Sequence, residues 1–457
     1  MDYKQSINLL LSMVDHERTG LGGPRQRVIP DLGRMTSLLN RLDSPQNAAA
    51  ATIHITGTKG KGSTAALCDA ALRAGSYRTG FFSSPHLHHF RERIRLNTQP
   101  IEEHQFAELV EQVWPAARWV SQDTDLGFVT LFEFITAMAF QCYAQEQVEF
   151  QTIEVGLGGR LDATNLVRPD VCVITSISLD HTAILGDTIA LIAADKAGII
   201  KPGAAVVIGP QRPEALSVIL EACQKLSIDP IQVGRDITWE GGPSTIDGQH
   251  LVVRGRLDQY HLDIPLLGRH QLENAATAVA ALEALRERGH EVLSGAMRSG
   301  FEQVSWPCRM EVLSRDPLVV ADGAHNVYAM ETLLESMPQY FDYDRLLLVV
   351  GFSRDKNVEE MVHRLARVGD LVFTTRSRHP RSLAQEAVAG HFRELGVEVA
   401  EMPTTAEALA TALEMADPGD LVLGTGSLFL AAEMREAVLG IEPALYPDLL
   451  PADLRPP

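Results

Sequence analysis

The sequence predicts an α/β protein with two domains, and three observations support this. Short apolar runs alternate with helical patterns, which is typical of parallel sheets covered by helices on both faces. A turn-rich stretch at 231–266 interrupts the alternation, which restarts after a linker at 305–309. The length of 457 residues also exceeds what one compact core usually holds. We expect a first domain over 1–304, a second, Rossmann-like domain over 305–440 and a proline-rich tail over 441–457.

The first domain is expected to hold a parallel sheet and a small antiparallel subsheet. The sheet starts with the apolar run Thr52–Thr56, and the subsheet corresponds to the turn-rich stretch at 231–266. Further strands are predicted at Gly80–Ser84, Thr152–Val155, Val171–Ser176 and Ala205–Gly209. Helices are predicted at Gln105–Val120, Leu131–Gln145, Ile189–Ala197, Glu214–Leu226 and Leu272–Glu287. In the second domain, strands are predicted at Leu318–Ala321, Leu346–Val350, Leu371–Thr374, Val397–Glu401 and Leu421–Gly424.

A glycine-rich segment joins the first strand to a helix at Ala65–Leu72. It reads Gly57-Thr58-Lys59-Gly60-Lys61-Gly62-Ser63-Thr64. In such a segment glycines let backbone N–H groups approach phosphates, the helix N-terminus favours negative charge, Lys61 adds a cation and Ser63 can ligate Mg²⁺. The spacing is shorter than in G-x-x-x-x-G-K-[ST], so an ordinary glycine-rich turn is the alternative. The flanking strand and helix favour a P-loop that binds a nucleotide.

Three further residues of the first domain are candidates for chemistry. Ligands bind at the carboxyl ends of strands in an open α/β sheet, which is where we expect these residues to lie. Glu154 is suited to Mg²⁺ on ATP phosphates, or else it caps an ordinary turn. His181 is a candidate metal ligand, or else a loop histidine with a local partner. Lys196 lies near a helix end, where a solvated lysine would simply favour the helix C-terminus.

Two more clusters are rich in basic and polar side chains. The segment Ser83–Arg95 contains three histidines and three arginines, which could seat an anionic substrate or form a solvated basic loop. In the second domain, Asp322–Asn326 lies where a strand gives way to a helix. It is either part of a site or a polar turn with an N-cap.

The composition indicates a globular protein without a nucleic-acid or membrane surface. Hydrophobic residues make up 45% and charged residues 22% of the chain, and 40 basic against 59 acidic residues give a formal charge of −19. The five cysteines are scattered and show no C-x-x-C spacing, as expected of reduced thiols. The chain opens on no signal-peptide pattern and has no apolar run of eighteen residues. We expect a soluble, cytoplasmic protein.

Taken together, the motifs resemble the folylpolyglutamate synthase and dihydrofolate synthase family, within the Mur-ligase-like ATP-dependent amide ligases. The matching stretches follow one another in the family's order over most of the chain. They are Gly57–Thr64, Ser83–Ile94, Glu154–Asn165, Leu179–Gly186, Ile192–Gly203, Gly268–Ala275, Trp306–Glu311, Asp322–Asn326 and Gly424–Leu430.

The resemblance implies a role for each matched residue. Ser63 and Glu154 would hold one Mg²⁺, His181 would help to hold a second, and Lys196 would be carbamylated and lie beside the metals. ATP would be bound by Gly57, Thr58, Lys59, Gly60, Lys61, Gly62, Ser63 and Thr64, with Asn274 at the adenine, Arg309 at the triphosphate and Asp322 at the ribose. Catalysis would involve Lys61, Lys196 and His325, and the acceptor and incoming glutamate would lie near Ser84, Pro85, Arg93 and His325.

The implied reaction joins L-glutamate to the carboxylate of a folate, of dihydropteroate, or of both, through an acyl phosphate made from ATP. The expected protein is a monomer, and its N-terminal segment, with Arg18, Arg25 and Arg27, could help to select the pterin. Lys59 and Cys308 depart from the commoner Asn and Gly or Ala of bacterial members. Three alternatives stay open: a Mur ligase that adds an amino acid to a cell-wall nucleotide precursor, a kinase or switch NTPase, and a catalytically silent ATP-binding regulator.

Overall fold

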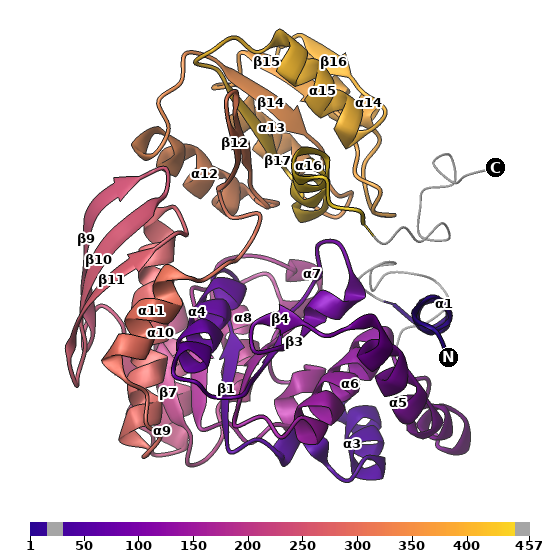
Figure 1. Cartoon of the computed structure of the whole chain (residues 1–457), viewed down its shortest axis with the longest axis vertical. Helices are drawn as coiled ribbons and strands as arrows, with labels where there is room; N and C mark the ends of the chain where they lie inside the picture. The colour runs from indigo at the N-terminus through magenta and orange to yellow at the C-terminus, as the bar shows by residue number, and fades with distance from the viewer. Residues whose placement is uncertain (16–30, 444–457) are drawn as a thin grey trace.

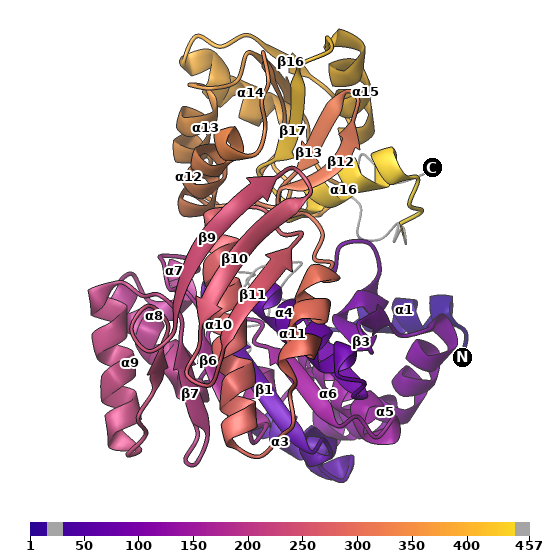
Figure 2. The ribbon, with the colours of Figure 1, turned by 60° about the vertical axis from the view of Figure 1, so that its left-hand side comes forward.

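The computed structural model describes residues 1–15 and 31–443 and places them in two lobes (Figure 1). The first lobe holds an eight-stranded sheet and the second a six-stranded sheet. A three-stranded antiparallel sheet stands at one side in Figure 1, and Figure 2 shows that it reaches from the first lobe towards the second. Arg18, Arg25, Arg27 and residues 444–457 of the expected tail lie outside the described residues.

The large sheet of the first lobe has the strand order β4-β3-β2-β5-β1-β6-β7-β8. The six strands from β2 to β8 in this order pair in parallel, so their carboxyl ends share one edge. The strands are β1 (Ala51–Thr56), β2 (Thr79–Phe82), β3 (Ile94–Leu96), β4 (Gln99–Pro100), β5 (Phe150–Glu154), β6 (Val171–Ile174), β7 (Ala205–Ile208) and β8 (Ile231–Gln232).

Helices cover both faces of this sheet, because alternate side chains of its strands enter different cores. On β6, Val171 and Val173 join the core beneath α4 and α10, whereas Cys172 and Ile174 join the core beneath α8 and α9. The helices of the first lobe are α1 (Tyr3–Leu11), α3 (Leu32–Arg41), α4 (Lys61–Ala74), α5 (Glu103–Asp123), α6 (Leu131–Gln145), α7 (Thr182–Leu185), α8 (Ile189–Lys196), α9 (Pro213–Lys225), α10 (Arg269–Glu287) and α11 (Ser294–Glu302).

The expected α/β class is confirmed, but two details of the first lobe differ from the sequence-based prediction. The large sheet is mixed, because β3 and β4 form an antiparallel edge at the end of the basic segment Ser83–Arg95 and just after it, where the sequence predicted no strand. The strand β8 pairs with β7 of the large sheet, so the antiparallel subsheet contains only β9 (Thr238–Thr245), β10 (Gly248–Arg254) and β11 (Gln259–Ile264). Short edge strands carry too few residues for an alternating pattern to reveal them.

The second lobe has the strand order β12-β13-β17-β14-β15-β16, and only β12 is antiparallel to its neighbour. The sequence did not predict β12, which follows the linker directly. The strands are β12 (Glu311–Arg315), β13 (Leu318–Ala321), β14 (Leu346–Val350), β15 (Leu371–Thr374), β16 (Val399–Glu401) and β17 (Leu421–Thr425). The helices are α12 (Val327–Ser336), α13 (Val358–Leu365), α14 (Gln385–Glu394), α15 (Thr405–Met415) and α16 (Leu428–Leu439).

The five cysteines are all buried and unpaired, as the sequence predicts. Within the described ranges, the helices are either too short or too polar to cross a bilayer.

Candidate active site

The glycine-rich segment forms a tight loop between β1 and α4, at the carboxyl edge of the large sheet. The N–H groups of Thr58 and Lys59 donate to the carbonyl oxygen of Ser176, at 2.9 and 3.1 Å, which fixes the first half of the loop. Gly60 caps α4 with a φ of +85°, a conformation that glycine adopts without strain. The first intrahelical bond runs from the N–H of Thr64 to the carbonyl oxygen of Gly60, so the preceding N–H groups of α4 have no intrahelical partner and could bind an anion.

Two side chains pack so closely on this loop that its glycines have no room for a Cβ. A Cβ on Gly60 would lie 2.2 Å from Oδ1 of Asn274, which comes from α10. A Cβ on Gly62 would lie 2.6 Å from Cζ2 of Trp306, which comes from the linker between the lobes. The predicted adenine residue Asn274 is therefore directly at the P-loop, and the linker rests on the start of α4.

Glu154 and Lys196 are both brought to the P-loop and are both buried. The Lys196 ammonium donates to the carbonyl oxygen of Gly57 at 2.9 Å, and only 4% of Lys196 is exposed. Burial, together with the nearby charge of Lys61, lowers the pKa of Lys196 to about 7. Glu154 ends β5 and is 5% exposed. Its pKa is raised by burial to about 7, although Lys61 and Arg309 favour the carboxylate.

The residues at this edge fit a divalent cation. Oε2 of Glu154 is buried and has no hydrogen-bond partner among the described residues, and hard oxygen donors of this kind suit Mg²⁺. Ser63 is buried at the start of α4. His181 begins α7 with a φ of +51°, and burial lowers its pKa to about 4, so its imidazole is neutral. In the described part of the chain, no three His, Cys, Asp or Glu side chains converge on one metal position.

A carboxylate that follows β6 links the two lobes beside the P-loop. Asp180 lies 3.3 Å from the ammonium of Lys59 and 3.2 Å from that of Lys356, and it accepts a 2.9 Å hydrogen bond from Asn326. His325 completes the group, with Nε2 at 3.4 Å from the Lys59 ammonium. Although burial opposes it, the two ammonium groups hold the pKa of Asp180 well below its usual value. Two cations around one carboxylate leave a net positive site suited to phosphate.

The second lobe contributes Arg309, which lies just before β12, and Asp322, which follows β13 directly. The Asp322 carboxylate accepts the N–H groups of Met310 and Ala324, each at 2.8 Å, which fixes both neighbouring turns. Arg309 donates to the carbonyl oxygen of Cys308 at 2.9 Å, and its charge acts on Glu154. The groups predicted for the triphosphate and ribose thus lie across the interface from the P-loop.

The basic segment after β2 is an ordered loop, not a solvated one; we call residues 83–93 the acceptor loop. Arg93 is buried and its Nε donates to Nδ1 of His86 at 3.0 Å, which requires a neutral imidazole. The Ser84 N–H points to Glu154 and favours its charged form, and Pro85 follows directly. The predicted acceptor residues therefore adjoin the predicted metal ligands.

Sequence reasoning missed Lys356 and the buried partners of the acceptor loop. Lys356 follows β14, so the rule that ligands gather at the carboxyl ends of strands could have found it. The partners of the loop could not be found in this way, because they lie on a helix of the other lobe.

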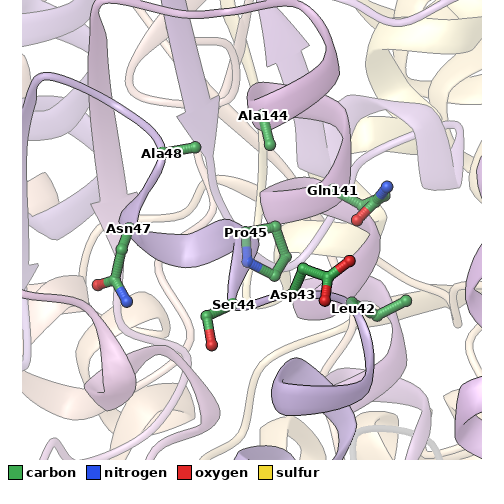
Figure 3. Close-up of a pocket in the computed structure, with 8 residues that line it drawn as sticks. All are labelled: Leu42, Asp43, Ser44, Pro45, Asn47, Ala48, Gln141 and Ala144. Atoms are coloured by element: carbon green, nitrogen blue, oxygen red, sulfur yellow. The ribbon is translucent and has the colours of Figure 1, made fainter.

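The hollow shown in Figure 3 lies elsewhere and is not part of this site. It is formed where the chain leads into the amino end of β1, the end opposite the P-loop. Its one acidic side chain is Asp43, and it has no basic one. The lining residues are Leu42, Asp43, Ser44, Pro45, Asn47, Ala48, Gln141 and Ala144.

Comparison with known proteins gives a consistent result. Models of the Mur ligase middle domain and of the Mur ligase glutamate ligase domain match residues 130–282 and 308–428. The chain is 35% identical to the dihydrofolate synthase/folylpolyglutamate synthase of Bacillus subtilis over 90% of this chain and 95% of that protein. Its fold is similar to that of Mycobacterium tuberculosis folylpolyglutamate synthase complexed with ADP, with a TM-score of 0.87, 32% identity and coverage of 96% of this chain and 99% of that chain. Escherichia coli FolC in complex with DHPP and ADP is also similar, with a TM-score of 0.83, 29% identity and coverage of 96% and 98%.

Proposed function

The chain belongs to the folylpolyglutamate synthase/dihydrofolate synthase family, and from this premise we propose that it is an ATP-dependent ligase that joins L-glutamate to a pterin-bearing carboxylic acid. The acceptors would be dihydropteroate and a reduced folate, as the names of several relatives suggest. The observation that carries the proposal is the convergence of Lys61, Glu154, Lys196 and Arg309 at one P-loop.

The nucleotide would lie between the lobes. The N–H groups at the start of α4 and the Lys61 ammonium would bind its phosphates, and Arg309 and Asp322 would approach it from the second lobe. We propose that residues 1–304 supply the P-loop domain and 305–440 the glutamate-ligase domain. Mg²⁺, held by Ser63 and Glu154 and at a second position by His181, would neutralise charge on the transferring phosphoryl group.

We propose that Lys196 carries a carbamate. Carbon dioxide reacts with a neutral amine, and a lysine whose pKa is lowered to about 7 by burial is largely neutral in mildly alkaline solution. The carbamate would turn a cation into an anion at the P-loop, beside the carbonyl of Gly57. This explains why a lysine, which would repel metals, lies beside residues that suit them.

The reaction would proceed in two steps. The acceptor carboxylate attacks the γ-phosphorus and expels ADP, which gives an acyl phosphate; the amine of L-glutamate then attacks the acyl carbon and expels phosphate. The cationic site formed by Lys59, Lys356 and Lys61 would reduce the repulsion between the carboxylate and the nucleotide. His325 would contact the attacking amine as a neutral imidazole, because Lys59 first and burial second hold its pKa well below the usual value. So weak a base would orient the amine, and the proton would leave with the expelled phosphate.

Contact between the lobes would protect the acyl phosphate from water. We propose that binding of nucleotide and acceptor tightens the arrangement in which Asp180 already pairs with Lys356 and Asn326 across the interface. Small-angle scattering with and without an ATP analogue and pteroate tests this: an unchanged radius of gyration would contradict the closure but not the ligase activity.

The decisive experiment measures ADP release with each acceptor, with and without L-glutamate, followed by mass spectrometry of the pterin product. We expect glutamate-dependent ADP release and a product heavier by one glutamyl residue with dihydropteroate, with a reduced folate, or with both. A Mur ligase would instead use a nucleotide–sugar peptide acceptor, a kinase would release ADP without glutamate, and a regulator would show no turnover. Any of these three outcomes would overturn the proposal.

A further inference from the structure

A buried polar network joins the acceptor loop to helix α16 of the second lobe. Nδ1 of His88 lies 2.9 Å from Oε1 of Glu436, and its Nε2 lies 3.2 Å from Nη1 of Arg435. An arginine can only donate, so His88 must accept at Nε2 and donate from Nδ1, as a neutral imidazole with a fixed tautomer. The His88 and Glu436 side chains are only 6% and 8% exposed, so this contact excludes water.

One carboxylate ties the middle of the acceptor loop together beside this contact. The carboxylate of Glu92 accepts the N–H groups of Leu87, His88 and His89, at 2.8 to 2.9 Å. Leu87 also packs against the core of the second lobe that includes Leu430 of α16. A shift of His88 would therefore disturb residues 87–92 together, in the same loop whose Ser84 adjoins Glu154.

The same arginine also holds the linker that carries Arg309. Nε of Arg435 donates to Oε1 of Glu311 at 2.9 Å, and Oε2 of Glu311 accepts the N–H of Cys308 at 2.8 Å. Cys308 in turn accepts a hydrogen bond from the Arg309 guanidinium. On the other side, Glu436 pairs with Arg378 of the loop after β15. One turn of α16 thus contacts the acceptor loop, the linker and the β15 loop.

We propose that Arg435 and Glu436 are positioning residues that fix the acceptor loop and the Arg309 linker relative to each other across the two lobes. The inference deepens the proposed function, on which its kinetic consequence rests. Arg435 makes two hydrogen bonds that lead towards different substrates, so their contributions can be separated. The bond to His88 positions the acceptor loop and should affect binding of the acceptor. The bond to Glu311 positions Arg309 and should affect binding of the nucleotide.

Three variants and a matched control test the proposal. We expect His88→Leu to raise the KM for the pterin acceptor at least about tenfold, because the variant loses the charged hydrogen bonds to both Glu436 and Arg435. It should leave the KM for ATP within about twofold. Glu311→Gln should raise the KM for ATP and leave the KM for the acceptor within about twofold. Arg435→Met should raise both KM values. Arg364→Met removes two more exposed ion pairs within the second lobe, with Glu331 of α12 and with Glu360 of α13, and should change neither KM. If Arg435→Met has the same KM values as Arg364→Met, the proposal is wrong.

Hydrogen exchange of the full chain, read by mass spectrometry, separates this inference from the proposed function. In Arg435→Met we expect faster exchange both in the peptide containing Leu87, His88 and His89 and in the peptide containing Cys308. In His88→Leu, only the first peptide should exchange faster. If the wild-type protein never glutamylates a pterin, the proposed function is refuted. The exchange differences would still support the positioning role of Arg435 and Glu436. Unchanged exchange in both peptides of a folded Arg435→Met would overturn the positioning role, whatever the activity.

Discussion

Replacement of Gly62 by alanine tests the contact between the P-loop helix and the linker. Gly62 lies in the first turn of α4, where alanine would normally favour the helix by up to about 1 kcal/mol. Here the new methyl group would lie 2.6 Å from Cζ2 of Trp306 and 3.0 Å from Cε2 and Nε1 of the same ring. Overpacking of this kind costs about 1–3 kcal/mol.

Trp306 is partly buried, and two neighbouring side chains limit how far its ring can move. Its ring packs against Phe81, with 5.5 Å between centroids, and the Arg95 guanidinium lies 5.7 Å from its centroid. We therefore place the overpacking cost in the upper part of its range and expect Gly62→Ala to lower the free energy of unfolding by about 1–2 kcal/mol. Affinity for ADP should also fall, because the same displacement moves the start of α4 and the linker before Arg309.

Urea unfolding followed by circular dichroism, with calorimetric titration of ADP, measures both effects. Gly390→Ala is the matched control, since Gly390 lies inside α14 and its Cβ would meet nothing within 4 Å. In this control the free energy of unfolding should rise by up to about 1 kcal/mol. Trp306→Leu in the Gly62→Ala background should recover most of the lost stability. If Gly62→Ala is as stable as Gly390→Ala, the close packing of Trp306 on the P-loop helix is refuted.

Three further predictions concern the buried charges. Glu154→Ala should reduce turnover by about 10²–10³-fold and abolish its dependence on Mg²⁺, measured as glutamate-dependent ADP release over a Mg²⁺ titration; an unaltered titration would exclude Glu154 as a ligand. With ¹³C-bicarbonate, NMR should detect a carbamate that increases between pH 6 and pH 8, as the Lys196 ammonium loses its proton near pH 7, and that is absent from Lys196→Met; equal signals would contradict the carbamate. Asp180→Asn leaves Lys59 and Lys356 facing each other, so it should lower the unfolding free energy by about 2–3 kcal/mol at pH 7 in urea titrations. The pKa of Asp180 is lower in the folded than in the unfolded state, so this stabilisation is present above the unfolded pKa and is lost as pH falls through the folded one. The wild type and Asp180→Asn should therefore converge in acid, and a difference that persists there would oppose this assignment.

The sequence was sufficient to place those candidate residues that lie in or beside a strand or helix predicted from a local pattern. The P-loop, Glu154 at the end of β5 and Lys196 at the end of α8 lie where the strand and helix patterns placed them. The P-loop and Glu154 each follow or end a strand at the same edge of a parallel sheet, so the order of strands implies their proximity. Lys196 ends a helix instead, and its place at the P-loop follows from the family resemblance and not from the strand order. The family resemblance, now confirmed by the relatives, rests on the same local motifs.

Contacts between the lobes were beyond the reach of sequence patterns. Lys356 and Asp180 are 176 positions apart, and His88 and Glu436 are 348 apart. Neither pair shares a helix or strand, so no periodicity relates them. The edge strands β3 and β4 were missed for a different reason: their pairing depends on β2, and they are too short to show alternation.

The unpaired cysteines give the protein a set of internal chemical reporters. Cys68, Cys142, Cys172 and Cys308 belong to four different cores, two on opposite faces of the large sheet, one among the helices beside it and one in the second lobe. Burial raises the pKa of Cys142 and of Cys172 to about 12, so an alkylating reagent will find almost no thiolate while a core stays closed. The order in which these thiols become labelled under mild denaturant would therefore reveal which part of the molecule opens first, without any engineered probe.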